Sequence, residues 1–305
     1  MQQFDRRNFL KTISIAGAAT LAGMHALALR DASLEKICIL HTNDTHSRLD
    51  PFPDNDPNYP GMGGYARRAS LVKQFRATED NLLLVDAGDI FQGTPYYNMY
   101  GGEPELRLMS KMGYDAAAFG NHEFDNGLDG FKKVQPFASF PFLAANYDFS
   151  QTLLAGKIKS QTIIERSGKK IGIYGLGINP EGLVSRALYG DTKYLDPIAI
   201  AGEVEERLFK QHRCELIICL SHLGFSYETD QVSDVIIAEN TRYTDIIIGG
   251  HTHNVLDPPA TVVNKRDQNV TIAQAGYGGV FLGKLNVYFN KPANSKFVEA
   301  YTTKI

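Results

Sequence analysis

Ile246-Ile247-Ile248-Gly249-Gly250-His251-Thr252-His253 is the most informative segment of the chain. It joins an apolar run to two glycines and then to two histidines. A short apolar run bounded by residues that break regular structure is typical of a buried strand. The two histidines therefore follow the carboxyl end of a strand, which is where ligands gather in sheets covered by helices.

Four other apolar runs also end in residues that can bind a metal. These residues are Asp44 and His46 after 37–40, Asp89 after 82–85, Asn121 and His122 after 116–119, and His222 after 216–220. Each residue could instead cap a helix, form a turn or have a structural role. However, five of the eight histidines lie at these strand ends, and helix capping does not explain that concentration. The pattern therefore indicates a metal site built from several strands.

Two pairs of these residues are separated by a single threonine: Asp44 with His46, and His251 with His253. In an extended segment, residues two apart point the same way, so we expect each pair to reach one ion. The two oxygens of Asp89 can bridge two cations. Gly249 and Gly250 would give the backbone room to approach an ion.

The complete set supplies three or four ligands to each of two ions about 3.5–4 Å apart, the spacing of two-metal sites. Mixed nitrogen and oxygen ligands favour Zn²⁺, Mn²⁺ or Fe over Ca²⁺ or Mg²⁺. The predicted metal ligands are Asp44, His46, Asp89, Asn121, His222, His251 and His253.

The composition is typical of a globular protein, with 305 residues of which 43% are hydrophobic and 21% charged. This length suits one large domain or two small ones. Residues 29–305 contain no linker, repeat or low-complexity tract, so we expect a single domain there. A formal net charge of -3 and the lack of a basic patch or aromatic ladder give no support to nucleic-acid binding.

Apolar stripes at helical spacing predict helices over 64–78, 103–112, 128–134, 198–211 and 227–239. Two strands, 162–165 and 170–174, are predicted to form a hairpin, and 270–275 and 284–289 are predicted to be a closing pair of strands. Strands that alternate with helices, together with hairpins, indicate an α/β domain with mixed sheets.

Residues 1–28 are predicted to be a twin-arginine signal peptide. Arg6-Arg7 precedes an apolar stretch over 13–22, and Ala26-Leu27-Ala28 offers a cleavage site. The stretch is short for a membrane-spanning helix and no cysteine follows it, so we expect no stable membrane anchor. A disordered basic terminus is the alternative. The prediction places the protein in the periplasm.

The chain has three cysteines, Cys38, Cys214 and Cys219. Two of them lie in apolar strand runs, where cysteine usually behaves as a small buried hydrophobe. We therefore expect buried thiols, with a disulfide between Cys214 and Cys219 as the alternative. Thiols suit a protein that folds and binds its metals in the reducing cytoplasm before twin-arginine export.

The order of the strand-end motifs resembles that of the calcineurin-like metallophosphoesterase superfamily. The shared blocks are Asp44-Thr45-His46, Gly88-Asp89, Gly120-Asn121-His122-Glu123, Ser221-His222 and Gly249-Gly250-His251-Thr252-His253. The longer strings at 41–46, 63–67 and 121–127 resemble the catalytic domain of the bacterial 5'-nucleotidase family. The resemblance covers residues 35–290. It implies a four-layer αββα sandwich, with two mixed sheets between helices.

The resemblance also implies a role for each site residue. One metal would be held by Asp44, His46, Asp89 and His253, and the other by Asp89, Asn121, His222 and His251. The metals would generate a hydroxide that attacks phosphorus in line, without a covalent intermediate. His122 would stabilise the transition state or protonate the leaving oxygen, and Asp125 would orient its imidazole.

The implied function is a phosphohydrolase that acts on nucleotides, with 5'-monophosphates expected first. Related proteins act on broader phosphomonoesters, UDP-sugars, cyclic nucleotides or a cysteine-bound sulfonate. Family members carry a C-terminal domain that binds the nucleotide, and we expect that domain to be absent after Ile305. The protein would then act alone on a broader set of esters, or with a separately encoded domain. A metal-binding subunit without turnover is a further alternative, which the presence of His122 and Asp125 disfavours.

Overall fold

A computed structural model describes residues 35–290 and 295–305, so the predicted signal peptide lies outside the described residues. The described chain forms two compact units. The small unit comprises 35–36, 287–290 and 295–297, and in it the rings of Tyr288 and Phe297 stack with their centroids 4.6 Å apart. The large unit comprises 37–286 and 298–305 and contains every predicted site residue.

The first of two six-stranded sheets contains the strands that precede Asp44, Asp89 and Asn121. Parallel pairing joins β1 to β2, β2 to β3 and β3 to β4. Residues 37–42 of β1 and all of β2 are buried, as expected for strands covered on both faces. The order of the strands is β14 (Ser295–Lys304), β13 (Phe281–Asn290), β1 (Glu35–Thr42), β2 (Leu82–Asp86), β3 (Ala116–Ala118) and β4 (Phe142–Leu143).

The second sheet contains the strands that precede His222 and His251. Its four inner strands are parallel and its two edge strands are antiparallel, so the sheet is mixed. The order is β11 (Ala260–Val263), β12 (Asn269–Ala273), β10 (Ile246–Gly249), β9 (Leu216–His222), β7 (Lys169–Gly177) and β6 (Gln161–Arg166). The short strands β5 (Tyr147–Asp148) and β8 (Lys193–Tyr194) pair separately.

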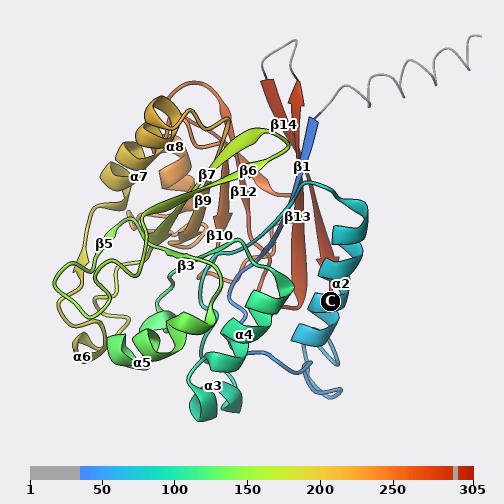
Figure 1. Ribbon diagram of the computed structural model, residues 1–305, viewed down its shortest axis with the longest axis vertical. Coiled ribbons are helices and arrows are strands. Elements are labelled where there is room, and N and C mark those ends of the chain that lie inside the picture. The colour runs from blue at the N-terminus through green and yellow to red at the C-terminus, as the bar shows by residue number, and fades with distance from the viewer. Residues whose placement is uncertain (1–34, 291–294) are drawn as a thin grey trace, which may run out of the picture. The chain divides into compact units, whose positions relative to one another are not determined.

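Helices cover the outer faces of both sheets (Figure 1). The first sheet packs against α2 (Tyr65–Thr78), α4 (Glu103–Met112) and α5 (Gly127–Val134), and the second against α7 (Pro197–Glu206) and α8 (Asp234–Asn240). The sheets face each other where β3 meets β7 and β9. The predicted four-layer αββα architecture with mixed sheets is therefore confirmed.

The structure corrects some predicted elements. The helix expected over 227–239 begins only at Asp234, because the Ser233 hydroxyl accepts a hydrogen bond from the amide of Ile236 and caps the helix there. The predicted helix 198–211 changes to a π-helical turn over Arg207–Gln211. Two further short helices, α3 (Pro95–Tyr100) and α6 (Arg186–Tyr189), were not predicted. All three cysteines are buried thiols, as predicted.

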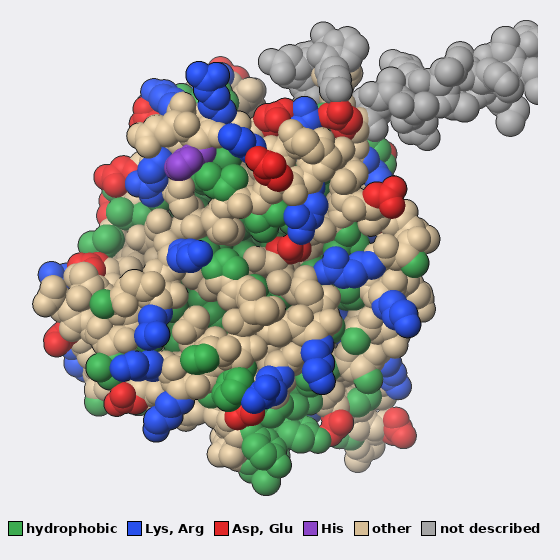
Figure 2. Space-filling model, in the orientation of Figure 1, with side chains coloured by type: hydrophobic (Ala, Val, Ile, Leu, Met, Phe, Trp, Pro, Cys, Tyr) green, Lys and Arg blue, Asp and Glu red, His purple; other side chains and the backbone are tan. Residues whose placement is uncertain are grey.

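Lys and Arg side chains are spread among acidic and neutral ones on the face shown in Figure 2. Apolar side chains gather at its lower end, where Figure 1 places α3. Met99 and Tyr100 of α3 are both strongly exposed. Among the described helices, none combines the length and apolar composition needed to cross a bilayer.

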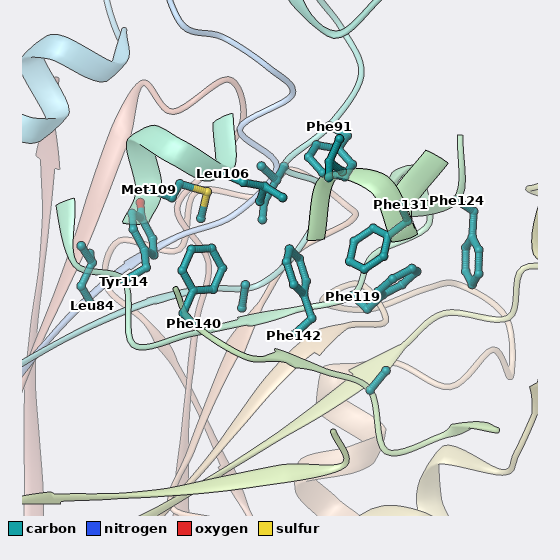
Figure 3. Packing of buried hydrophobic residues seen from close by; sticks show 14 of the residues in the cluster. Leu84, Phe91, Leu106, Met109, Tyr114, Phe119, Phe124, Phe131, Phe140 and Phe142 are labelled. Carbon is teal, nitrogen blue, oxygen red and sulfur yellow. The ribbon is translucent and has the colours of Figure 1, made fainter. Parts of the chain in front are cut away.

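An aromatic cluster packs between the first sheet and α5 (Figure 3). Phe131 of α5 is buried, and its ring centroid lies 4.8 Å from that of Phe119 and 4.9 Å from that of Phe142. Rings tilted or edge-on at this separation interact favourably beyond the effect of burial alone. Because Phe119 directly precedes Gly120 and Asn121, the cluster also supports the loop that carries a predicted ligand.

We expect Phe131→Ala to lower the free energy of unfolding by about 3–5 kcal/mol, because it removes a ring from a packed core. Phe209→Ala is a matched control, since the ring of Phe209 is 43% exposed and stacks on Tyr243 near the surface. Chemical denaturation of both variants would measure the difference. Equal losses of stability would contradict the assignment of Phe131 to the core.

Candidate metal centre

The candidate ligands lie on loops at the carboxyl ends of strands from both sheets. Asp44, His46, Asp89 and Asn121 follow strands of the first sheet, and the other three end or follow strands of the second. Six of the seven form two groups, in each of which the potential ligand atoms lie within 4.8 Å of one another. The groups are Asp44 with His46 and His253, and Asp89 with His222 and His251.

In the first group, nitrogen and oxygen ligand atoms converge at the edge of the site. Nε2 of His253 lies 3.2 Å from Nε2 of His46 and 3.3 Å from Oδ1 of Asp44. Asp44 is fully buried, whereas the side chain of His253 is 41% exposed. This group is therefore anchored in the interior and reaches solvent through His253.

The second group lies deeper in the protein. His222 is fully buried, and its Nε2 lies 2.9 Å from Oδ2 of Asp89. Oδ1 of Asn121, the seventh candidate, lies 2.9 Å from Nδ1 of His251 and so joins this group. His222 also links the two groups, because its Nε2 lies 3.9 Å from Oδ1 of Asp44.

The chemistry of this donor set fits divalent cations. Nδ1 of His222 donates to the carbonyl of Ala87 at 2.7 Å, which leaves Nε2 directed at the carboxylate of Asp89. A hydrogen bond of this kind fixes a metal-binding imidazole with Nε2 directed at the ion. In the described part of the chain, the ion-pair partners of the buried carboxylates Asp44 and Asp89 are all histidines. A cation between these groups would compensate both carboxylates.

The pKa values of the two histidines in the second group are shifted in opposite directions. Burial alone would lower the pKa of His222, but the charges of Asp89 and Asp44 raise it to about 10. Burial, helped by the neighbouring His222, lowers the pKa of His251 to about 4, so its imidazole is neutral. Because metal ligation requires a neutral imidazole, a bound cation would replace the proton on His222.

The backbone of the ligand loops is left-handed at five positions, with φ angles of 47° at Asp44, 46° at His46, 55° at Asp89, 73° at His251 and 56° at His253. Non-glycine residues rarely adopt this region. The extended geometry expected for the two threonine-separated pairs is therefore wrong. Tight turns bring the side chains together instead, and this strain is concentrated at the candidate site.

Two glycines leave room for the ligand side chains. A Cβ atom on Gly250 would lie 2.8 Å from Nδ1 of His222 and 3.0 Å from Oδ2 of Asp44. A Cβ atom on Gly88, whose φ is 92°, would lie 3.0 Å from the same nitrogen of His222. The two glycines thus allow ligand residues to approach one another, whereas the sequence suggested that Gly250, with Gly249, makes room for an ion.

Glu123 is a residue whose role the sequence analysis missed. Its buried carboxylate accepts hydrogen bonds from the backbone amides of Asp89 at 3.0 Å, Ile90 at 2.8 Å and Gly120 at 2.7 Å. It therefore ties the loop that carries Asp89 to the loop that carries Asn121. Glu123 stands inside a recognised motif, but the sequence has no signal for the amides that it binds.

His122 lies beside the metal-ligand groups and belongs to neither. Nδ1 of His122 is 2.8 Å from Oδ2 of Asp125, and Nε2 is 4.0 Å from Oδ2 of Asp89. Burial lowers the pKa of His122, but the hydrogen bond to Asp125 and the charge of Asp89 outweigh it and raise the pKa to about 9. The imidazole is thus held in one orientation and can carry a proton on Nε2 at neutral pH.

Two facing sheets between helices, with two groups of candidate metal ligands at one edge, define an α/β protein with a candidate metal centre. Residues 38–255 match the family described as Calcineurin-like phosphoesterase. The chain belongs to this family, as the sequence analysis predicted, and the family supports a metal-dependent phosphoester hydrolase.

Several relatives of the chain are 5'-nucleotidases. The chain is 34% identical to a snake venom 5'-nucleotidase of Gloydius brevicauda, in an alignment that covers 88% of this chain and 48% of the relative. It is 30% identical to a probable 5'-nucleotidase of Treponema pallidum, in an alignment that covers 95% of this chain and 51% of the relative. The crystal structure of a 5'-nucleotidase precursor from Thermus thermophilus superposes with a TM-score of 0.78 at 30% identity, covering 88% of this chain and 55% of that one. The chain spans about half the length of the curated relatives it matches.

We expect Glu123→Gln to weaken metal binding about 10- to 100-fold, the usual effect of losing a group that positions metal ligands. The amide would keep the size of the side chain but could not accept hydrogen bonds from three amides equally well. Glu206→Gln, which removes a charge from an exposed pair with Lys210, is the control. Competition with a chromogenic chelator would measure both affinities, and an unchanged affinity in Glu123→Gln would contradict the role of Glu123.

Proposed function

We propose that this chain hydrolyses nucleoside monophosphates at a pair of divalent cations. The observation that carries the proposal is the pair of adjacent ligand groups at the edge of the two sheets, linked through His222 and flanked by His122. Adjacent cation sites of this kind serve phosphoryl transfer. Nucleotides are proposed as substrates because the relatives are 5'-nucleotidases.

The proposed ligand assignment follows the two groups. Asp44, His46 and His253 would hold one cation, and Asn121, His222 and His251 the other, with Asp89 bridging them. When bound, the cations supply polarisation of the phosphoryl oxygens and lower the pKa of a water molecule. Mixed nitrogen and oxygen ligands favour Zn²⁺, Mn²⁺ or Fe. The carboxylates and imidazoles of the chain fix where these charges lie.

His122 is the proposed proton donor to the leaving oxygen. Its Nδ1 side is occupied by Asp125, so Nε2 is the nitrogen that can present a proton toward the site. Its elevated pKa keeps that proton in place at neutral pH. A carboxylate that orients and charges an imidazole in this way is a common device for acid catalysis. Asp125 is accordingly a positioning residue.

The twin-arginine signal, the periplasmic location and a separately encoded partner domain stay predictions from the sequence. Of these, the signal concerns residues outside the described part of the chain.

His122→Ala should keep both metals and lower kcat about 10²–10⁴-fold, because it removes a proton donor without touching a proposed ligand. Asp125→Asn should give a smaller loss. His212→Ala, at an exposed position after the π-helical turn, is the control and should match the unchanged protein. Steady-state kinetics with metal analysis would measure these effects. Full activity in His122→Ala would remove its proposed role.

Purified protein should contain about two transition-metal ions per chain, as the two ligand groups imply. A strong chelator should abolish phosphate release, and Zn²⁺ or Mn²⁺ should restore it. Phosphate release from AMP, ADP, UDP-glucose, 2',3'-cyclic AMP and p-nitrophenyl phosphate would rank the substrates. Hydrolysis that is insensitive to the chelator would contradict the metal mechanism. A preference for UDP-glucose or the cyclic ester would contradict the proposal that nucleoside monophosphates are the substrates.

A further inference from the structure

A cavity of about 780 Å³ adjoins the second ligand group. His251 forms part of its wall, and Leu223, which also lines it, directly follows the candidate ligand His222. Pockets that hold small organic ligands commonly have volumes of about 300–1,000 Å³. The cavity is therefore large enough for a substrate group attached to a phosphate at the metal centre.

The loop after β7 connects this cavity with the neighbourhood of His122. Residues 178–179 and 181–183 contribute to the lining, and the chain then continues into α6. There the ring of Tyr189 lies 6.3 Å from that of Phe124, and Leu188 lies next to Gly127. Phe124 and Gly127 closely follow His122 in the chain. The cavity is thus bounded by His251 of the second ligand group, and the loop that lines it leads to a helix packed beside the residues that follow His122.

The lining combines apolar walls with hydrogen-bonding groups. Tyr227 is held in place because its hydroxyl donates to the carbonyl of Leu223 at 2.6 Å. Glu181 and Asp230 are the charged residues of the lining, and neither lysine nor arginine is among the described residues that line it. A group that carries negative charge would therefore meet repulsion there, whereas hydroxyl and amine donors would find acceptors.

We propose that this cavity binds the leaving alcohol of the substrate and selects a neutral alcohol that has an apolar face and hydrogen-bond donors. The inference rests on the proposed function, because it assumes that phosphoryl transfer occurs at the adjacent metal centre. Water adds to phosphorus, the bond from phosphorus to the ester oxygen breaks, and that oxygen takes a proton. From AMP the departing group is neutral adenosine, whereas removal of the terminal phosphate of ADP releases anionic AMP into the same cavity.

Direct binding of adenosine to the metal-loaded protein, measured by calorimetry, tests the cavity without requiring turnover. Leu183→Trp should weaken adenosine binding roughly tenfold, because it places a larger side chain in the cavity. Val263→Trp is a matched control, since Val263 is 54% exposed against 55% for Leu183 and does not line the cavity. Absence of adenosine binding, or equal effects of the two variants, would overturn the assignment.

The double variant Glu181→Gln/Asp230→Asn tests the selection by charge. We expect it to reduce the ratio of kcat/KM for AMP to kcat/KM for ADP about two- to fivefold. The effect is small because exposed carboxylates interact only weakly with other charges. Glu203→Gln/Glu206→Gln on α7 is the charge-matched control. An unchanged preference for AMP over ADP in the cavity variant would contradict selection of the leaving group by charge. If adenosine binds at the cavity and no phosphate ester is hydrolysed, the proposed function fails while the binding site stands.

Discussion

The carboxylate of Glu123 organises the metal-ligand loops, because it accepts hydrogen bonds from three backbone amides on two of them. Backbone donors in the interior must be paired, and a single carboxylate here satisfies three. The side chains of Asp89 and Asn121 take their positions from the loops fixed in this way. Neither residue could converge with His222 and His251 if the two loops moved independently.

The architecture and the convergence of the site could be predicted from sequence because parallel strands end at a common edge. Apolar runs marked β1, β2 and β3 in one sheet and β9 and β10 in the other, so the residues after them were expected at the carboxyl edge of each sheet. The turns themselves could not be predicted. The left-handed backbone at Asp44 or His251 is imposed by tertiary contacts, such as the hydrogen bond from the amide of His251 to the carboxylate of Asp44. Local sequence carries no record of such contacts.

Helix boundaries failed for a related reason. The apolar residues of 227–239 suggested one long helix, but residues 227–233 instead form a loop that lines the cavity through Tyr227 and Asp230. The periodicity of side chains reports which residues face inward, and it does not tell whether they cover a sheet or line a hollow. The histidines and carboxylates of the sequence predicted the chemistry of the candidate metal centre. They did not predict the neighbouring cavity, because the residues that line it do not form a recognisable sequence pattern.

The origin of the ligands in both sheets gives metal binding a place in the order of folding. Asp44 and His253 are separated by more than two hundred residues in the chain, so their approach closes a very long loop and depends on contacts that form slowly. A cation that binds both must wait until β1 and β10 occupy their places in facing sheets. Metal uptake would then report when the two sheets have assembled. The bound cation would afterwards cross-link them.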